Sequence, residues 1–158
     1  MKIGFRVAAL LLIITLAANC GGGGNTITFE GNSMLPTIRN GQQLQRIPLD
    51  TQSRAGLVRG DIVAFGSAAE PSKVYIRRLI ALPGETVEIQ QGSVVIDRNR
   101  LAEPYLDRRF NLTQESWPAI TVPPHTYYLL GDNRDGSYDS RRLGVIPEEM
   151  VFAKIIIR

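Results

Sequence analysis

The sequence is poor in the residues that build disulfides and transition-metal sites. Its 158 residues include one cysteine, Cys20, and one histidine, His125. A single cysteine cannot form an intrachain disulfide, and cysteine usage therefore does not identify the redox compartment. A zinc site needs several Cys or His side chains at defined spacings, and no such set is present. The composition thus predicts neither a disulfide nor a metal site, and no motif points to a cofactor.

The sequence also lacks a cluster of positive charge. Lys and Arg number 18 against 15 Asp and Glu, which gives a net charge of +3, and no basic run is longer than two residues. Nucleic-acid binding requires a basic stripe, often with aromatic side chains that stack on bases. We therefore expect a solvated basic surface and no nucleic-acid partner. Such a surface is also compatible with an anionic membrane face.

An apolar run occurs at the N-terminus. Lys2 and Arg6 lead into residues 7–18, which are almost all apolar. A signal-peptide core needs about 7–15 such residues and a bilayer span about 20, so residues 1–19 are predicted to be a targeting or anchor segment. Residues 16–20, Leu-Ala-Ala-Asn-Cys, resemble a lipoprotein cleavage box, which makes Cys20 a candidate for lipidation. An uncleaved anchor and simple secretion remain alternatives, and the first two readings hold the domain at the outer membrane surface.

Beyond this segment the sequence predicts a flexible tether and one mostly β domain. Residues 20–25 contain four consecutive glycines, which are typical of a flexible lead-in. From residue 26 to 158, short β-rich segments alternate with turn residues, and no long helical stripe appears. Gln90-Gln91-Gly92 lies between two such segments and predicts a hairpin. The expected strands are residues 26–29, 61–65, 74–82, 86–89, 93–96, 126–130 and 151–157. This pattern predicts an antiparallel, sandwich- or barrel-like β domain.

Four sequence blocks occur in the order found in one enzyme family. They are residues 30–38 (EGNSMLPTI), 59–65 (RGDIVAF), 75–85 (YIRRLIALPGE) and 131–141 (GDNRDGSYDSR). Together they resemble the bacterial type I signal peptidases, also called leader peptidases, in a minimal form without the large inserted domain. The resemblance covers about residues 26–158. It implies a signal-peptidase-like β-sheet domain, a serine endopeptidase without cofactor, and signal peptides of exported preproteins as substrates at the outer face of the cytoplasmic membrane.

The resemblance also implies roles for individual residues. Ser33 matches the nucleophile, whose backbone N–H helps to bind the oxyanion, and such a donor is worth about 3–4 kcal/mol of barrier. Ser137 matches the hydroxyl that orients the base. Substrate contacts are expected from Met34, Pro36 and Tyr75. Structural roles at the site are expected from Asp132, Asn133, Asp139 and Arg141, the last two as an ion pair. For Met34, core packing is the alternative, and Phe29 is expected in an apolar rim that could enter lipid.

The position of the general base carries an arginine. Tyr75-Ile76-Arg77-Arg78 aligns with the family's Tyr-Ile-Lys-Arg, which places Arg77 where the lysine belongs. Lowering the pKa of a lysine from about 10.4 to about 8 costs roughly 3 kcal/mol, whereas lowering that of an arginine from about 13.8 costs roughly 8. The second cost is comparable with the whole stability of a domain, about 5–15 kcal/mol. Arg77 is therefore not expected to act as a general base.

Two other residues are candidates for the missing base. Lys73 shares the strand parity of Arg77 but lies about 13 Å farther along an extended strand. His125 has a suitable intrinsic pKa but follows Pro123-Pro124, ahead of a predicted strand. Two hypotheses remain: a signal peptidase that cleaves exported preproteins, and a catalytically impaired relative that binds extended polypeptides as an accessory or chaperone at the membrane surface.

Overall fold

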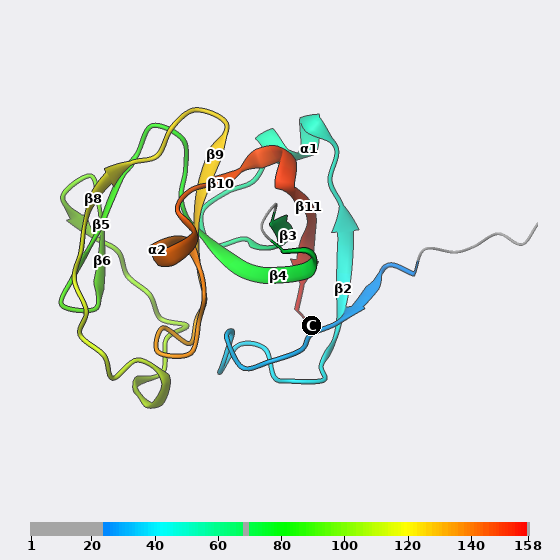
Figure 1. Ribbon diagram of the computed structural model, residues 1–158, viewed down its shortest axis with the longest axis horizontal. Helices are drawn as coiled ribbons and strands as arrows, with labels where there is room; N and C mark the ends of the chain where they lie inside the picture. Colours follow the sequence, from blue (N-terminus) through cyan, green and yellow to red (C-terminus); the bar gives the residue numbers. More distant parts are fainter. Residues whose placement is uncertain (1–23, 68–69, 158) are drawn as a thin grey trace, which may run out of the picture.

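The computed structural model describes residues 24–67 and 70–157, which form two antiparallel β-sheets (Figure 1). The predicted anchor segment and Cys20 lie outside the described residues. The larger sheet has the strand order β1-β2-β11-β3-β4-β9-β10 and the smaller sheet the order β7-β6-β5-β8. In chain order the strands are β1 (Thr26–Thr28), β2 (Gln43–Pro48), β3 (Ile62–Ser67), β4 (Glu70–Ala81), β5 (Thr86–Gln90), β6 (Ser93–Ile96), β7 (Asn99–Arg100), β8 (Trp117–Thr121), β9 (Thr126–Leu130), β10 (Ile146–Pro147) and β11 (Val151–Ile156). The predicted fold class, a mostly β domain with antiparallel sheets, is confirmed.

Helices are short and lie between strands. They are α1 (Thr51–Ala55), α2 (Ser140–Leu143), and the 3-10 helices η1 (Arg108–Phe110) and η2 (Glu148–Met150). In the part of the chain that the structure describes, none of the helices has the length and apolar character needed to cross a bilayer.

The β5–β6 hairpin illustrates how local sequence sets the backbone. Val87 pairs with Ile96 and Ile89 with Val94, so four β-branched side chains share one face. Gln91 and Gly92 link the strands with φ of 46° and 76°. Positive φ at both central residues matches the right-handed twist of the flanking strands, which is why two-residue loops favour such turns. The predicted hairpin is therefore present.

Three clusters of buried side chains hold the sheets together. One lies between the two sheets and combines side chains of β4 and β9 with those of β5 and β6. A second packs Tyr75 and Leu79 of β4 against β3, β9 and β11. The third includes Met34, Phe29 and Ile76. Burying one such side chain contributes about 1.5–3 kcal/mol, and this apolar packing therefore fixes where β4 lies.

Two expectations for exposed apolar residues need correction. Met34 is 0% exposed and packs with Phe29, Ile38 and Leu44. It therefore supports the turn from inside and, in this structure, lines no accessible surface, which is the core role kept as the alternative. Phe29 is 4% exposed, so its expected place in an apolar rim is wrong. Both side chains turn inward because the turn that follows β1 closes one end of this core cluster.

Strand β4 is paired along only part of one side. Its N-terminal half pairs with β3, from Ser67 opposite Glu70 to Val63 opposite Arg77. On the other side β9 begins to pair at Arg78, opposite Leu130. Residues 70–77 therefore have no strand partner on that side within the described residues. This half of β4, termed the open edge below, ends at Arg77.

Candidate functional site

Ser33 and Arg77 lie next to each other. The Arg77 Nη1 group donates a hydrogen bond of 2.8 Å to Ser33 Oγ, across 44 positions of sequence. Ser33 belongs to the turn after β1, and Arg77 lies at the end of the open edge of β4. The fold therefore brings the predicted nucleophile position and the predicted base position together.

The turn that carries Ser33 is held by the Asn133 segment. The backbone N–H of Asn133 donates to the Ser33 carbonyl at 3.1 Å, and its side-chain Nδ2 donates to the Asn32 carbonyl at 3.0 Å. Asn133 itself accepts from the Gly136 N–H at 2.8 Å, which fixes the orientation of its amide. These bonds from Asn133 hold the backbone of the Ser33 turn in place.

Ser33 retains two unused donors. No acceptor for its backbone N–H or for its hydroxyl proton is found in residues 24–67 and 70–157. Gly31, two positions earlier, has a φ of 101°, a conformation that favours glycine, and its N–H donates to Asn40 Oδ1 at 2.7 Å. Position 31 therefore offers no side-chain hydroxyl as a further donor. The donors that Ser33 can offer are its own N–H and O–H groups.

Arg77 is buried and bonded to neutral acceptors. Its side chain donates to the Tyr138 carbonyl from Nη2 at 2.7 Å and from Nε at 3.2 Å, and to the Ile76 carbonyl from Nη1 at 2.6 Å. Burial lowers the pKa of Arg77 to about 10, while the charge of Asp139 acts in the opposite direction. A group with a pKa of about 10 is unprotonated in only about one molecule per thousand at pH 7. Arg77 is therefore a cation that donates to Ser33, the reverse of what a general base does.

Tyr75 supports Arg77 from the side. The Arg77 guanidinium carbon lies 5.5 Å from the centroid of the Tyr75 ring, a cation–π arrangement. The ring stacks on Phe65 at 5.4 Å, and its hydroxyl donates to Glu70. At 3% exposure, Tyr75 offers little surface to a substrate, unlike the exposed Pro36. In this structure Tyr75 contacts Arg77, and its expected contact with a substrate stays a prediction.

Neither alternative base lies at Ser33. Lys73 Nζ is 3.3 Å from Glu70 and 5.0 Å from the Tyr75 ring centroid, and interactions with Tyr75 and Glu70 raise the pKa of Lys73. A raised pKa makes a lysine a weaker proton acceptor at neutral pH. His125 pairs with Glu148 at 2.9 Å, and its side chain is 80% exposed. No contact joins either residue to Ser33 among the described residues.

Ser137 reaches the site without a hydrogen-bond partner. Its Oγ is buried, and no donor or acceptor lies within reach in the described part of the chain. A Cβ at Gly131 would come within 2.2 Å of this oxygen and within 2.5 Å of the Ser33 carbonyl. Ser137 therefore packs on the bare backbone of Gly131, next to Ser33. Arg77 bonds to the carbonyl of Tyr138 and not to Ser137, so the orienting role of Ser137 stays a prediction.

Asp139 and Arg141 form an ion pair behind the site. Asp139 is fully buried and lies 2.8 Å from Arg141 Nε. It also accepts from the Gly131 N–H at 3.0 Å and from the Arg141 N–H, which caps helix α2. Bonds to several donors stabilise a buried carboxylate. Asp139 thus holds together the two ends of the segment that contains Ser137.

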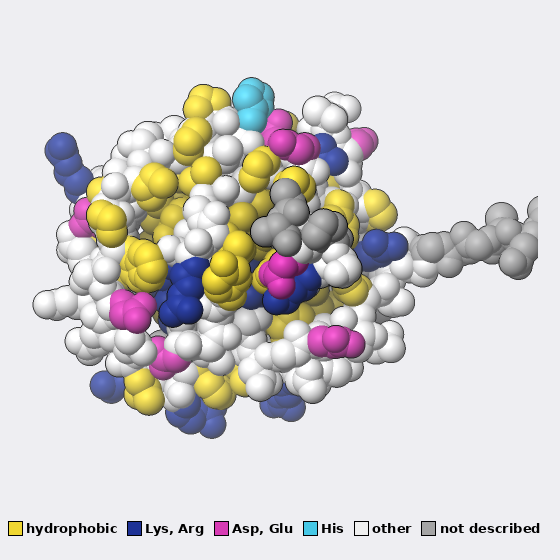
Figure 2. All heavy atoms as spheres, viewed as in Figure 1, with side chains coloured by type: hydrophobic (Ala, Val, Ile, Leu, Met, Phe, Trp, Pro, Cys, Tyr) yellow, Lys and Arg dark blue, Asp and Glu magenta, His cyan; other side chains and the backbone are white. Residues whose placement is uncertain are grey.

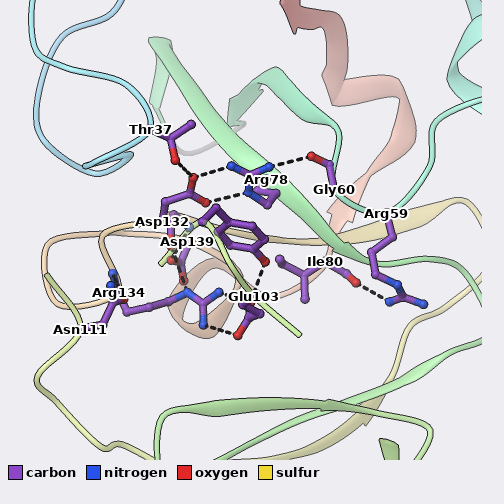
Figure 3. A network of polar contacts seen from close by, with 12 residues as sticks. Thr37, Arg59, Gly60, Arg78, Ile80, Glu103, Asn111, Asp132, Arg134 and Asp139 are labelled. Atoms are coloured by element: carbon purple, nitrogen blue, oxygen red, sulfur yellow. Dashed lines mark hydrogen bonds and ion pairs between the residues drawn. The ribbon is translucent and has the colours of Figure 1, made fainter. Parts of the chain in front are cut away.

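A second network surrounds Arg78, the neighbour of Arg77 (Figure 3). Arg78 forms two hydrogen bonds with Asp132, at 2.8 and 2.6 Å, and Asp132 also accepts from Thr37. The Arg78 guanidinium carbon lies 3.9 Å from the centroid of the Tyr105 ring. The sequence predicted a structural role for Asp132 but did not identify Arg78 as its partner.

The network continues to a second buried ion pair. Glu103 pairs with Arg134, with both side chains 6% exposed, and accepts from the Tyr105 hydroxyl at 2.7 Å. Arg134 also donates to the Gly131 carbonyl at 3.1 Å. The sequence analysis missed Glu103 and Tyr105. Arg134 lies inside the 131–141 block, so its position in that block was the only available signal.

The cavities do not coincide with Ser33. A polar cavity of about 270 Å³ opens beside Ser137 and Tyr138. A larger hollow of about 1370 Å³ lies on the outer face of the smaller sheet and contacts none of the predicted site residues. Since the hollow is shallow and lined by polar side chains such as Glu88 and Gln90, it resembles an ordinary solvated sheet face. The side chains of the candidate site thus lie around Ser33, away from the larger hollow.

Two residues that are sequence neighbours of site residues expose apolar surface. Val74, on the open edge of β4, is 47% exposed, and Tyr138 is 45% exposed. Figure 2 shows a face of the molecule on which hydrophobic side chains form a broken patch, interrupted by basic and acidic side chains. Among the described residues, no group of three or more His, Cys, Asp or Glu side chains could hold a metal ion.

The chain is similar to known signal peptidases over most of its length. A family model described as signal peptidase, peptidase S26, matches residues 3–158. Signal peptidase I T of Bacillus subtilis (strain 168) is 39% identical over 133 residues, which cover 77% of this chain and 66% of the relative. Signal peptidase IB of Staphylococcus aureus (strain COL) is 30% identical over 148 residues, covering 83% and 75% respectively. The chain thus spans about two thirds of the length of the Bacillus relative.

A solved structure shares the fold. The crystal structure of a signal peptidase I from Enterococcus faecalis V583 matches with a TM-score of 0.52 and 33% sequence identity. The match covers 60% of this chain and 92% of that one.

Proposed function

Because the chain belongs to the signal peptidase family, peptidase S26, we propose that it binds the signal peptides of exported preproteins, or similar extended polypeptides, and cleaves them slowly or not at all. The binding takes place at the outer face of the cytoplasmic membrane, where residues 1–19 or a lipid on Cys20 hold the domain. The protein therefore acts as a peptide-binding accessory or chaperone with a catalytic site that has lost its base.

The observation that carries this proposal is the hydrogen bond from Arg77 to Ser33. A serine hydroxyl attacks a peptide carbonyl only when a neighbour accepts its proton. Arg77 occupies the place of that neighbour, is protonated at neutral pH and donates to Ser33 Oγ at 2.8 Å. General base catalysis contributes typically 10²–10⁴-fold, and we expect a deficit of about that size.

The open edge of β4 supports peptide binding. On the side that no described strand covers, the backbone groups of residues 70–77 have no strand partner, although Pro71 has no N–H to offer and the Ile76 carbonyl accepts from Arg77. An extended peptide can add to such an edge as a further strand, with main-chain hydrogen bonds that do not depend on its sequence. Because the edge ends at Arg77, a bound peptide passes directly beside Ser33.

A second candidate function is that of an active serine endopeptidase. The unused N–H and O–H groups of Ser33 favour it, since the N–H is the donor that stabilises an oxyanion. The buried, unpartnered Ser137 Oγ also favours it, because such a hydroxyl can orient an amine. This function would require a proton acceptor that the described residues do not provide.

The test compares four full-length proteins on a signal-peptide substrate: the wild type, Ser33→Ala, Arg77→Lys and the double variant of the two. We expect cleavage near background for the wild type. We expect Arg77→Lys to gain about 10²–10⁴-fold, because a lysine amine can lose its proton and bond to Ser137. The double variant with Ser33→Ala is the matched control and must return to background. Rapid wild-type cleavage that Ser33→Ala abolishes would establish the endopeptidase instead.

A further inference from the structure

The described part of the chain contains four arginines with side chains that are almost completely buried. Three of them each have a carboxylate partner: Arg78 with Asp132, Arg134 with Glu103, and Arg141 with Asp139. These pairs follow the general rule that a charge removed from water is stabilised only by a close counterion or several hydrogen bonds. The fourth arginine, Arg77, does not follow it.

Arg77 is 5% exposed and has no carboxylate at ion-pair distance in residues 24–67 and 70–157. Its acceptors are the carbonyls of Ile76 and Tyr138 and the hydroxyl of Ser33, all of them neutral. The Asp139 carboxylate raises its pKa from a distance but is bonded to Arg141. The site therefore holds an uncompensated positive charge at the end of the open edge.

The groups around this charge that remain available to a ligand are hydrogen-bond donors. Four of the five guanidinium N–H groups are used, which leaves one on Nη2. Because Arg77 donates to Ser33 Oγ, the hydroxyl proton of Ser33 is free to point toward a ligand, as is its backbone N–H. A ligand that meets only donors and a positive charge is stabilised most when it is an acceptor with negative charge. A carboxylate fits this requirement, whereas an amide, which also carries N–H donors, does not.

We propose that Ser33 and Arg77 bind the free α-carboxylate of an extended peptide that ends at this point. The proposal rests on the peptide-binding function above and names its ligand class. A peptide that runs parallel to β4 along the open edge brings its C-terminal end to Arg77. There the carboxylate accepts charge-assisted hydrogen bonds and supplies the missing counterion. The preferred ligand is thus a chain that has already been cut, and not one that continues past Ser33.

The experiment uses two N-terminally labelled peptides of one signal-peptide sequence, identical except that one ends in a free carboxylate and the other in an amide. Fluorescence anisotropy with the full-length protein at neutral pH gives both dissociation constants. We expect the acid to bind about 10-fold or more tightly than the amide, the usual scale for one charge-assisted contact. Arg77→Gln is expected to abolish the difference. Arg77→Lys keeps the positive charge but not the planar guanidinium, and this variant should retain part of the preference for the acid.

Arg100→Gln is the matched control, since it removes one exposed positive charge on β7, in the other sheet, and should leave the preference unchanged. Equal binding of the acid and the amide by the wild type would overturn the carboxylate inference while leaving the peptide-binding function intact. If neither peptide binds, the proposed function fails and this inference fails with it. An equal loss of preference in Arg100→Gln would also overturn it, because the effect would then reflect net charge.

Discussion

Arg77 and Arg78 are neighbours on one strand, yet their surroundings differ in kind. Arg78 points into a network in which Asp132 supplies a bidentate carboxylate and Tyr105 an aromatic face (Figure 3). Arg77 points to the opposite side of the strand, where only neutral groups and Ser33 receive its hydrogen bonds. Both are almost completely buried, so burial alone does not distinguish them.

The difference between them shows that a counterion decides whether a buried arginine has only a structural role or remains available to bind a ligand. Arg78 and Asp132 neutralise each other, so nothing remains for a ligand to satisfy. Arg77 retains its charge at neutral pH and lies beside a hydroxyl with an unused proton. Within residues 24–67 and 70–157, Arg77 is the almost completely buried arginine without a carboxylate partner, which makes its position the one at which a ligand can supply the counterion.

The comparison predicts that the same substitution has a large effect on stability at Arg78 and a small one at Arg77. Arg78→Met leaves Asp132, which is 1% exposed, without its cation and should lower the free energy of unfolding by about 3–5 kcal/mol. Arg77→Met leaves no carboxylate behind, so relief of the buried charge offsets the lost bonds to Tyr138, and we expect a change within about 1 kcal/mol. Urea unfolding of both variants measures the two values.

Arg109→Ala is the control for this pair, because the Arg109–Asp107 ion pair is exposed and should contribute less than about 1 kcal/mol. Equal losses for Arg77→Met and Arg78→Met would show that Arg77 has a counterion in solution, and the distinction between the two sides of β4 would be lost.

A smaller effect on stability is expected from a substitution at Gly131, which packs against both Ser137 and the Ser33 backbone. Gly131→Ala places a methyl group within 2.2 Å of Ser137 Oγ and within 2.5 Å of the Ser33 carbonyl. Overpacking of this kind costs typically 1–3 kcal/mol, and here it should also displace Ser33 and weaken peptide binding. Gly66→Ala is the matched control, since nothing lies within 4 Å of a Cβ there. Unchanged peptide affinity in Gly131→Ala would show that Ser33 does not depend on this close packing.

The smallest effect concerns pH and Arg77 alone. In the folded protein, burial lowers the pKa of Arg77 from its ordinary, higher value to about 10. Above pH 10 the unfolded chain therefore holds this proton more tightly than the folded one, and stability should rise with pH. Relative to Arg77→Gln, we expect the wild type to gain about 1 kcal/mol between pH 9 and pH 11. The preference for the peptide acid should fall over the same range. A pH-independent difference in urea unfolding would contradict the lowered pKa.

The local sequence pattern predicted the strands that contain several apolar side chains in alternation or in a continuous run. Residues 126–130 were expected as a strand and form β9, and the β5–β6 hairpin lies where its turn residues indicated. Strands β2 and β8 were missed. In β2 only Leu44 is buried, and β8 contains Pro118 and is mostly exposed. Because both strands are held mainly by backbone pairing, side-chain periodicity carries little information about them.

The candidate site was predicted through family resemblance and not through local pattern. The resemblance placed Ser33 and Arg77 together, and the structure joins them. It could not supply the partner of Arg78, because Asp132 lies 54 positions away and only the assembled sheet brings the two together. It also misplaced Met34, since the sequence does not tell which side of a turn faces inward.

The bonds from Asn133 to the Ser33 turn have a consequence for synthesis. They join the first and last blocks of the domain across about a hundred residues of chain. A chain of which the Asn133 segment has not yet emerged lacks these bonds and cannot fix Ser33. We therefore expect the domain to capture a peptide only after residues 131–141 have joined the fold.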